Sequence, residues 1–168
     1  MRSEPTPPYR ERRARVAAAL RAAGGGVAIL QTAPERQRSG DTDHPYRHGS
    51  DFHYLTGFAE PGGWLAIGAD GRTTLACRPK DVQRELWDGI RLGPEAAPAA
   101  LGIDEAVVLD ALDETMVARL AGAPAVWWTF DSPEVGAHVQ RWLERVRAGE
   151  RGGLCAPHAQ NDLAPLLA

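Results

Sequence analysis

The chain has 168 residues, of which 43% are hydrophobic and 24% charged, and its net charge at pH 7 is -3. This length and composition are typical of one folded globular domain, which argues against disorder. No stretch approaches the roughly 20 apolar residues of a membrane-spanning helix, and the nearly balanced charge argues against a nucleic-acid partner. We therefore expect residues 1–168 to form one domain of a cytoplasmic protein, without a membrane or nucleic-acid partner.

The chain begins with a predicted helix and a predicted strand. Apolar residues recur at helical spacing between Tyr9 and Ala23, and Gly24–Gly26 then end the pattern. The short apolar run 27–30 predicts a buried strand. Residues 32–45 are polar and lack periodicity, which predicts a long loop. A loop of that length is uncommon in a compact domain unless it has a function.

The middle and second half of the chain predict a mixed sheet. Trp64–Ala69 and Arg72–Arg78 are strand-like runs joined by Asp70-Gly71, a strong hairpin signal. Beyond them we expect helices at 81–88, 94–101, 113–121 and 134–147, the last capped by Ser132, and strands at 106–109 and 125–130. A hairpin followed by alternating strands and helices predicts an α/β fold, a three-layer α/β/α arrangement with helices on both faces of the sheet.

The end of the chain and the cysteines carry weaker signals. Residues 154–168 are interrupted by two prolines, Pro157 and Pro165, which predicts a domain cut at its linker. Cys77 and Cys155 lie far apart and lack the spacing of a zinc site or a redox pair. We expect both to be buried free thiols.

Potential metal ligands gather in one part of the sequence. They are Asp41, Asp43, His44, His48, Asp51 and His53. We expect Asp51 and His53 to share one face of a strand, but their spacing matches no established ligand pattern, and a catalytic metal needs three or more converging ligands. Polar side chains of a loop are the favoured interpretation, and a metal site is the alternative.

The sequence contains no recognisable catalytic nucleophile. No serine or cysteine lies in a nucleophile elbow, and Gly24–Gly26 precedes a strand, whereas a nucleotide-binding loop follows one. We therefore predict that no residue of this chain is catalytic. Its function therefore has to be inferred from a resemblance to known proteins or from a partner.

Two segments of the chain resemble one enzyme family. Residues 46–61 read YRHGSDFHYLTGFAEP and closely resemble a signature of the N-terminal domain of bacterial Xaa-Pro aminopeptidases, in the creatinase/prolidase family. Residues 84–97 read RELWDGIRLGPEAA and resemble a second segment of that domain, at the expected distance. The resemblance extends over the whole chain and departs from the family pattern at His53, where tryptophan is common.

The resemblance implies a fold for this chain and a separate domain for catalysis. The N-terminal domain of this family has a ribonuclease-H-like layered sheet. A second domain holds two divalent metals, usually manganese, and metal-bridged water attacks the peptide bond before proline. None of that domain's ligand motifs occurs in these 168 residues. We therefore expect the metal domain to be absent from this chain, and the chain alone to hold no metal and to be inactive.

The resemblance also implies two site residues and several partners. Family members form dimers or tetramers in which the N-terminal domain borders a neighbouring subunit's active site. Trp87 corresponds to a tryptophan that reaches toward the neighbour's substrate pocket, and Asp41 to an acidic residue of the preceding loop with a similar placement. The expected partners are the C-terminal catalytic domain, further copies of the chain and a proline-containing peptide.

Two other functions are compatible with such a domain. The first is a free-standing oligomerisation or peptide-binding module without hydrolase activity. The second is a creatine amidinohydrolase or dipeptidase with the same N-terminal fold. The segment SDFHYLTGFAEP disfavours the second alternative, which the fold alone does not exclude.

Overall fold

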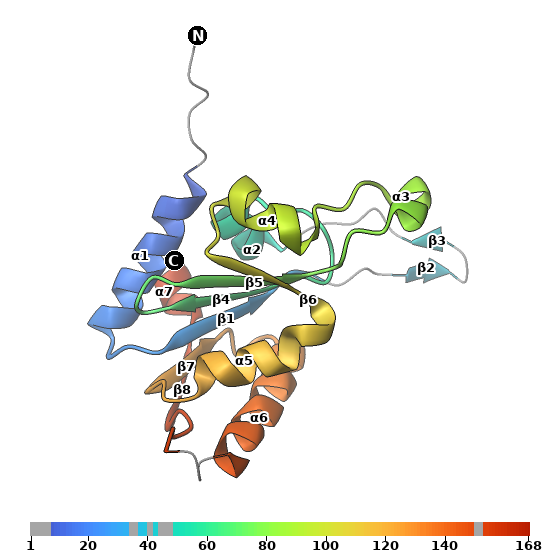
Figure 1. Ribbon diagram of the computed structural model, residues 1–168. Helices are drawn as coiled ribbons and strands as arrows, with labels where there is room; N and C mark the ends of the chain where they lie inside the picture. Colours follow the sequence, from blue (N-terminus) through green and yellow to red (C-terminus); the bar gives the residue numbers. More distant parts are fainter. Residues whose placement is uncertain (1–7, 34–36, 40–41, 44–48, 150–152) are drawn as a thin grey trace.

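The computed structural model describes residues 8–33, 49–149 and 153–168, together with the backbone of 37–39 and 42–43. Its centre is a six-stranded sheet with the order β6-β5-β4-β1-β7-β8 (Figure 1). The strands are β1 (Val27–Gln31), β4 (Trp64–Gly68), β5 (Thr73–Cys77), β6 (Glu105–Val108), β7 (Ala125–Trp128) and β8 (Ala159–Asp162). Two short strands, β2 (Gln37–Ser39) and β3 (Thr42–Asp43), pair separately.

The direction of the strands decides which loops share an edge of the sheet. Strand β4 is antiparallel to both of its neighbours, β1 and β5, while the pairs β5–β6, β1–β7 and β7–β8 are parallel. Every strand of this sheet except β4 therefore runs the same way. The segments that follow β1, β5 and β7 all leave the sheet at one edge, called here the carboxyl edge.

Helices cover both faces of the sheet, which confirms the predicted three-layer α/β/α fold. One face carries α1 (Tyr9–Ala22), α2 (Ser50–Thr56), α4 (Gly93–Leu101) and α7 (Ala164–Leu167), and the other carries α5 (Leu112–Leu120) and α6 (Pro133–Ala148). A 3-10 turn (Leu109–Ala111) precedes α5, and α3 (Val82–Asp88) projects from the carboxyl edge. None of the described helices has the length and apolarity needed to cross a membrane.

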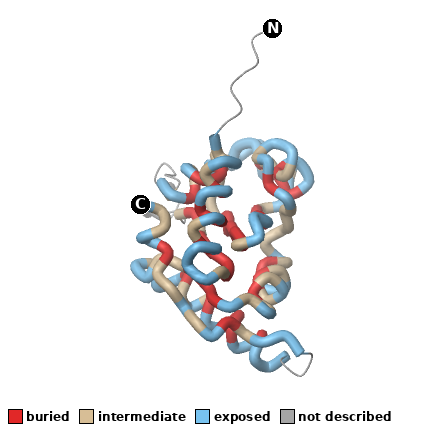
Figure 2. The backbone as a smooth tube through the Cα atoms, turned by 90° about the vertical axis from the view of Figure 1, so that its left-hand side faces the viewer, coloured by how far each residue is buried: buried red, intermediate tan, exposed pale blue. Residues whose placement is uncertain are grey.

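Alternation along the strands builds one hydrophobic core on each face. In β1, Ala28 and Leu30 pack toward α1 and α2, whereas Val27 and Ile29 pack toward α5 and α6, because successive side chains of a strand point to opposite faces. Figure 2 shows buried residues running through the middle of the molecule, with exposed residues around them. Each large apolar side chain buried in this way contributes roughly 1.5–3 kcal/mol.

The predicted first helix is confirmed, within one residue, by α1. Its buried residues are Arg13, Val16, Ala17 and Leu20, a stripe at the i, i+3, i+4, i+7 spacing of one helix face. The backbone N–H of Gly25 donates to the carbonyl of Leu20 at 2.7 Å and closes the helix end. The glycine triplet thus ends the helix and leads directly into β1.

The strand expected around Asp51 and His53 is wrong, because residues 50–56 form helix α2. Phe52, Leu55 and Thr56 are buried, and their spacing is that of a helix face. Gly57 ends α2 with a left-handed φ of 72°, and a Cβ there would lie 2.6 Å from the ring of Tyr9. Only glycine fits this position without strain.

Four other details also differ from prediction. The segment expected to be a loop, 32–45, contains the β2–β3 pair, and the expected linker, 154–168, contains β8 and α7. Strand β8 is an outermost strand of the sheet and pairs only with β7. It can therefore be polar, and it lacks the apolar pattern by which a strand is recognised in a sequence. Cys77 is buried as expected, but Cys155 is exposed. Ser132 precedes α6, but its side chain makes no capping hydrogen bond.

Candidate functional site

An unusual group of exposed apolar side chains lies on and just after α3. None of the seven residues of this helix is buried, and the side chain of Trp87 is 88% exposed. We call this group the α3 surface; its members are Val82, Leu86, Trp87 and Ile90, all largely exposed. Exposed large apolar groups gathered in one place mark an interaction site more often than an isolated exposed leucine does.

Local signals rather than burial form α3. Asp81 caps the helix, since its side chain accepts hydrogen bonds from the backbone N–H groups of Gln83 and Arg84 at 3.1 and 3.2 Å. Gly89 follows the last turn with a φ of 88°, which terminates the helix at a residue that tolerates this conformation. The helix is therefore specified locally, and its apolar residues remain available for a partner.

Buried Arg91 fixes the segment that carries α3. Its guanidinium contacts the carboxylate of Asp88 at 3.3 Å, and its backbone N–H donates to the carboxylate of Glu85 at 3.2 Å. Lys80 reaches the same Glu85 carboxylate at 3.5 Å. The two ends of the segment 80–91 are thus tied together, so Trp87 projects into solvent from a restrained support.

The two sequence segments that resemble the aminopeptidase family meet beneath α3. Glu60, in the first segment, accepts a 2.6 Å hydrogen bond from the backbone N–H of Leu92 in the second. Cys77 lies close by at the end of β5, and burial together with the negative charges of Glu60 and Glu95 raises its pKa to about 11. This thiol is protonated at neutral pH and is not an activated nucleophile.

The sheet topology relates the two predicted site residues, Trp87 and Asp41. The chain enters α3 from β5 and enters the segment containing Asp41 from β1, two strands that run parallel on either side of β4. Both segments therefore leave the carboxyl edge, from strands about 10 Å apart. In Figure 1, α3 and the β2–β3 pair lie at the same end of the molecule. Asp41 itself lies outside the described residues.

The acidic and histidine residues near Asp41 do not form a metal site in the described part of the chain. Asp51 and His53 lie two positions apart on α2, so their side chains point about 200° apart around the helix. The ring of His53 packs edge-on against Tyr9, with centroids 6.4 Å apart. His44 and His48 lie outside the described residues. Among those that are described, no three His, Cys, Asp or Glu side chains lie close enough to hold a metal ion together.

Some features of the carboxyl edge are not singled out by the sequence pattern. Trp87 is accompanied on the α3 surface by Val82, Leu86 and Ile90. The sequence signal that could have found these three residues is a group of apolar residues close to Trp87, in a short helix that begins with a strong cap. Past β7, Phe130 is half exposed and packs at a tilt against Trp128, with ring centroids 4.7 Å apart. Aromatic side chains are thus exposed beyond two strands of the same edge.

Comparison with known proteins relates the whole chain to one family. A family model described as "Aminopeptidase P, N-terminal domain" matches residues 9–127. An Xaa-Pro aminopeptidase of Escherichia coli (strain K12) is 34% identical over 148 residues, which make up 85% of this chain and 34% of that protein. One of Haemophilus influenzae is 36% identical over 109 residues, 63% of this chain and 25% of that protein.

Solved structures show the same relationship. The low-pH form of aminopeptidase P from E. coli superposes with a TM-score of 0.89 at 33% identity, covering 98% of this chain and 38% of that one. Aminopeptidase PepP from Pseudomonas aeruginosa gives a TM-score of 0.84 at 34% identity, covering 99% of this chain and 38% of that one. This chain therefore spans roughly a third of the length of these relatives.

Proposed function

The chain belongs to the family of aminopeptidase P N-terminal domains, and on this premise we propose that it is the oligomerisation and substrate-access domain of an Xaa-Pro aminopeptidase. Such an enzyme releases the N-terminal residue that precedes a proline. In this proposal the enzyme is metal-dependent. Its two divalent metals, for which the family resemblance implies manganese, belong to a catalytic domain outside these 168 residues. The described residues offer no ligand set for them.

The α3 surface is the observation that carries this proposal. Trp87 and Leu86 are 88% and 84% exposed on a helix that contributes no buried residue. Transfer of a large apolar side chain from water into an interface is worth roughly 1.5–3 kcal/mol when burial is complete. Tryptophan is also over-represented among the residues that dominate binding energy at interfaces. A neighbouring subunit is the partner that we propose for this surface.

Trp87 has a further proposed role as part of the wall of the neighbour's substrate pocket. The segment 80–91 is held by Arg91 and Glu85, so the indole is presented from a fixed support and can orient a peptide without contacting the metals. The segment containing Asp41 leaves the same edge of the sheet, and we propose that it borders the same pocket. The proposed oligomer is a dimer or a tetramer, in the cytoplasm; that location stays a prediction.

Subunit mixing tests the proposed action of Trp87 on a neighbouring subunit. One form of a full-length protein carrying this domain has Trp87→Ala, and the other keeps Trp87 but lacks a metal ligand of its catalytic domain. Each form alone is expected to have low activity against an Xaa-Pro peptide. Mixed oligomers should regain activity, because an intact pocket then meets an intact Trp87. Confirmed mixed oligomers without this gain would reject the role.

Assays of the natural, unmixed protein distinguish the free-standing module from the enzyme domain. If the natural protein carries no metal-binding catalytic domain, it should self-associate or bind peptide without releasing an amino acid. Analytical sedimentation would then detect an oligomer that dissociates more readily in the Leu86→Asp variant. Peptidase assays would detect no activity. Metal-dependent release of the N-terminal residue by the natural protein would instead exclude the module.

A further inference from the structure

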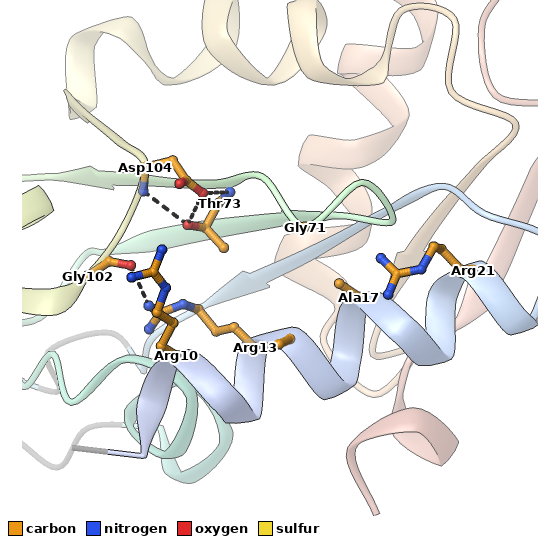
Figure 3. Close-up of a pocket in the computed structure, with 9 residues that line it drawn as sticks. Arg10, Arg13, Ala17, Arg21, Gly71, Thr73, Gly102 and Asp104 are labelled. Carbon is orange, nitrogen blue, oxygen red and sulfur yellow. Dashed lines mark hydrogen bonds between the residues drawn. The ribbon is translucent and has the colours of Figure 1, made fainter. Parts of the chain in front are cut away.

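A second candidate site lies at the other end of the strands from α3, opposite the carboxyl edge. It is a cavity of about 150 Å³ between α1, the turn before β5 and the residue before β6 (Figure 3). A water molecule needs roughly 10–15 Å³ of such volume, so the cavity has room for a polyatomic ion. The charged residues that line it are Arg10, Arg13, Arg21 and Asp104.

The period of α1 brings three arginines to this cavity. Arg10, Arg13 and Arg21 lie at positions i, i+3 and i+11, which fall on one face of a helix. Ala14 and Ala17 lie between them on the same face and also line the cavity. Because these two side chains are small, the helix leaves a hollow there. In Figure 3, Arg10 and Arg13 point toward Gly102 and Asp104, while Arg21 extends from the other end of the helix.

The hydrogen bonds of these arginines leave their charge largely uncompensated. Arg13 is only 2% exposed and donates to the carbonyls of Leu55, Leu101 and Gly102 at 2.8, 3.0 and 2.7 Å. Arg21 donates to another neutral carbonyl, that of Ala69, at 2.6 Å. Within the described part of the chain, Arg10 donates no hydrogen bond, and none of the three arginines forms a salt bridge.

Asp104 supplies the negative charge of the cavity and is already engaged. Its carboxylate accepts hydrogen bonds from the backbone N–H and the hydroxyl of Thr73 at 2.8 and 2.9 Å. The backbone hydrogen bond from Thr73 is the main cause that lowers the pKa of Asp104, so the carboxylate is ionised at neutral pH. The lining therefore carries three guanidinium groups and one carboxylate, a formal excess of two positive charges, and the charges of Arg10 and Arg13 are the ones that act on Asp104.

The charge of Arg13 is held in an unfavourable environment, chiefly because its side chain is buried. Burial lowers the pKa of Arg13, the carboxylate of Asp104 opposes that change, and the charge of Arg10 lowers the pKa further. The two guanidinium groups thus repel each other in a site partly screened from water. A bound anion would remove this repulsion and use the donors that remain free on Arg10 and Arg21.

We propose that this cavity binds an oxyanion of the phosphate class, with Arg10 as the direct donor to a single phosphate, Arg21 as a second donor to a longer diphosphate, and the buried charge of Arg13 behind them. Guanidinium groups match phosphate oxygens in geometry and form charge-assisted hydrogen bonds with them. Arg10 and Arg21 are separated by eleven residues, about 16 Å of helix axis. A free phosphate therefore depends mainly on the end of the cavity with Arg10, and a diphosphate group reaches toward Arg21 as well.

Calorimetry and thermal unfolding of the 168-residue chain test the proposal. Phosphate, diphosphate and sulfate are titrated at constant ionic strength, with chloride as the reference anion. We expect saturable binding and a rise in Tm that follows the anion concentration. Arg10→Gln should weaken phosphate binding roughly tenfold. Arg10→Gln with Arg21→Gln should weaken diphosphate binding further than either single change.

Two variants control for charge and for folding. Arg15→Gln removes the same charge from an exposed position of α1 outside the cavity, and it should bind phosphate like the wild type. Asp104→Asn removes the competing carboxylate but keeps an oxygen acceptor for Thr73, and it should bind phosphate more tightly. Equal losses in Arg15→Gln and Arg10→Gln would overturn the proposal, as would a wild type that responds to phosphate no more than to chloride.

Discussion

The carboxylate of Glu60 and the backbone N–H of Leu92 form a 2.6 Å hydrogen bond across 32 positions of sequence. This contact joins the turn that leads into β4 to the segment that follows α3. It ties the exposed α3 surface to the core of the domain, since the aromatic ring of Phe58 is buried two residues before Glu60. The position of Trp87 therefore depends on a residue far from it in sequence.

Glu60→Ala should accordingly destabilise the domain by about 1–3 kcal/mol, the usual cost of leaving a partly buried backbone N–H, here that of Leu92, without its acceptor. Glu60→Gln keeps an acceptor oxygen and should lose less. Chemical denaturation of the three proteins measures the difference. Identical midpoints for wild type and Glu60→Ala would show that the Glu60–Leu92 contact does not hold this segment.

Phe58→Ala should cost roughly 3–5 kcal/mol, because it removes a ring that is 3% exposed from the core beside Phe52. Tyr54→Ala is the matched control. Its ring is 46% exposed and packs on the guanidinium of Arg12, 3.9 Å from the ring centroid, so it should cost about 1 kcal/mol or less. Equal losses in the two variants would contradict the assignment of Phe58 to the core.

The raised pKa of Cys77 predicts a loss of stability at alkaline pH. The folded state keeps the thiol protonated up to a pKa of about 11, whereas the reference value is 9.0. Between these values the unfolded chain binds fewer protons than the folded chain, so the free energy of unfolding falls as pH rises. The contribution is roughly 1.4 kcal/mol for each pH unit in that window. Cys77→Ala should flatten this part of the stability–pH curve; an unchanged curve would contradict the prediction.

The 168-residue chain should not release an amino acid from an Xaa-Pro peptide in the presence of manganese. The reason is chemical, because the described residues bring no three metal-ligating side chains together and hydrolysis in the proposed enzyme needs a metal-activated water. The assay follows release of the N-terminal residue by chromatography, with a full-length aminopeptidase as the positive control. Manganese-dependent turnover that copurifies with the chain would contradict this prediction.

Trp87→Ala in a full-length protein should lower kcat/KM by at least about tenfold, which corresponds to about 1.4 kcal/mol of transition-state stabilisation. Metal content and Tm should stay near the wild-type values, because the side chain is 88% exposed and contributes nothing to the core. Tyr54→Ala, an exposed aromatic on α2, serves as the control and should retain activity. A loss in proportion to dissociation of the oligomer would assign Trp87 to assembly alone.

Local sequence determines the elements that have a strong signal within a few neighbouring residues. The stripe of α1, the apolar run of β1 and the Asp70-Gly71 turn each follow from residues close together in the chain, and the structure confirms them. The segments 46–61 and 84–97 likewise indicate the family by their residues alone. Trp87 is singled out by the second of them, although its exposure on α3 is visible only in the structure.

Contacts between distant segments decide the rest. Residues 50–56 become a helix because Phe52 and Leu55 pack beneath α1, and polar β8 becomes a strand because β7 offers it an unpaired edge. Strand order brings the segments with Asp41 and Trp87 to one edge of the sheet, and Asp104 to the arginines of α1 at the other. These pairings join residues far apart in sequence, so their free energy comes from burial and hydrogen bonds that no local pattern records.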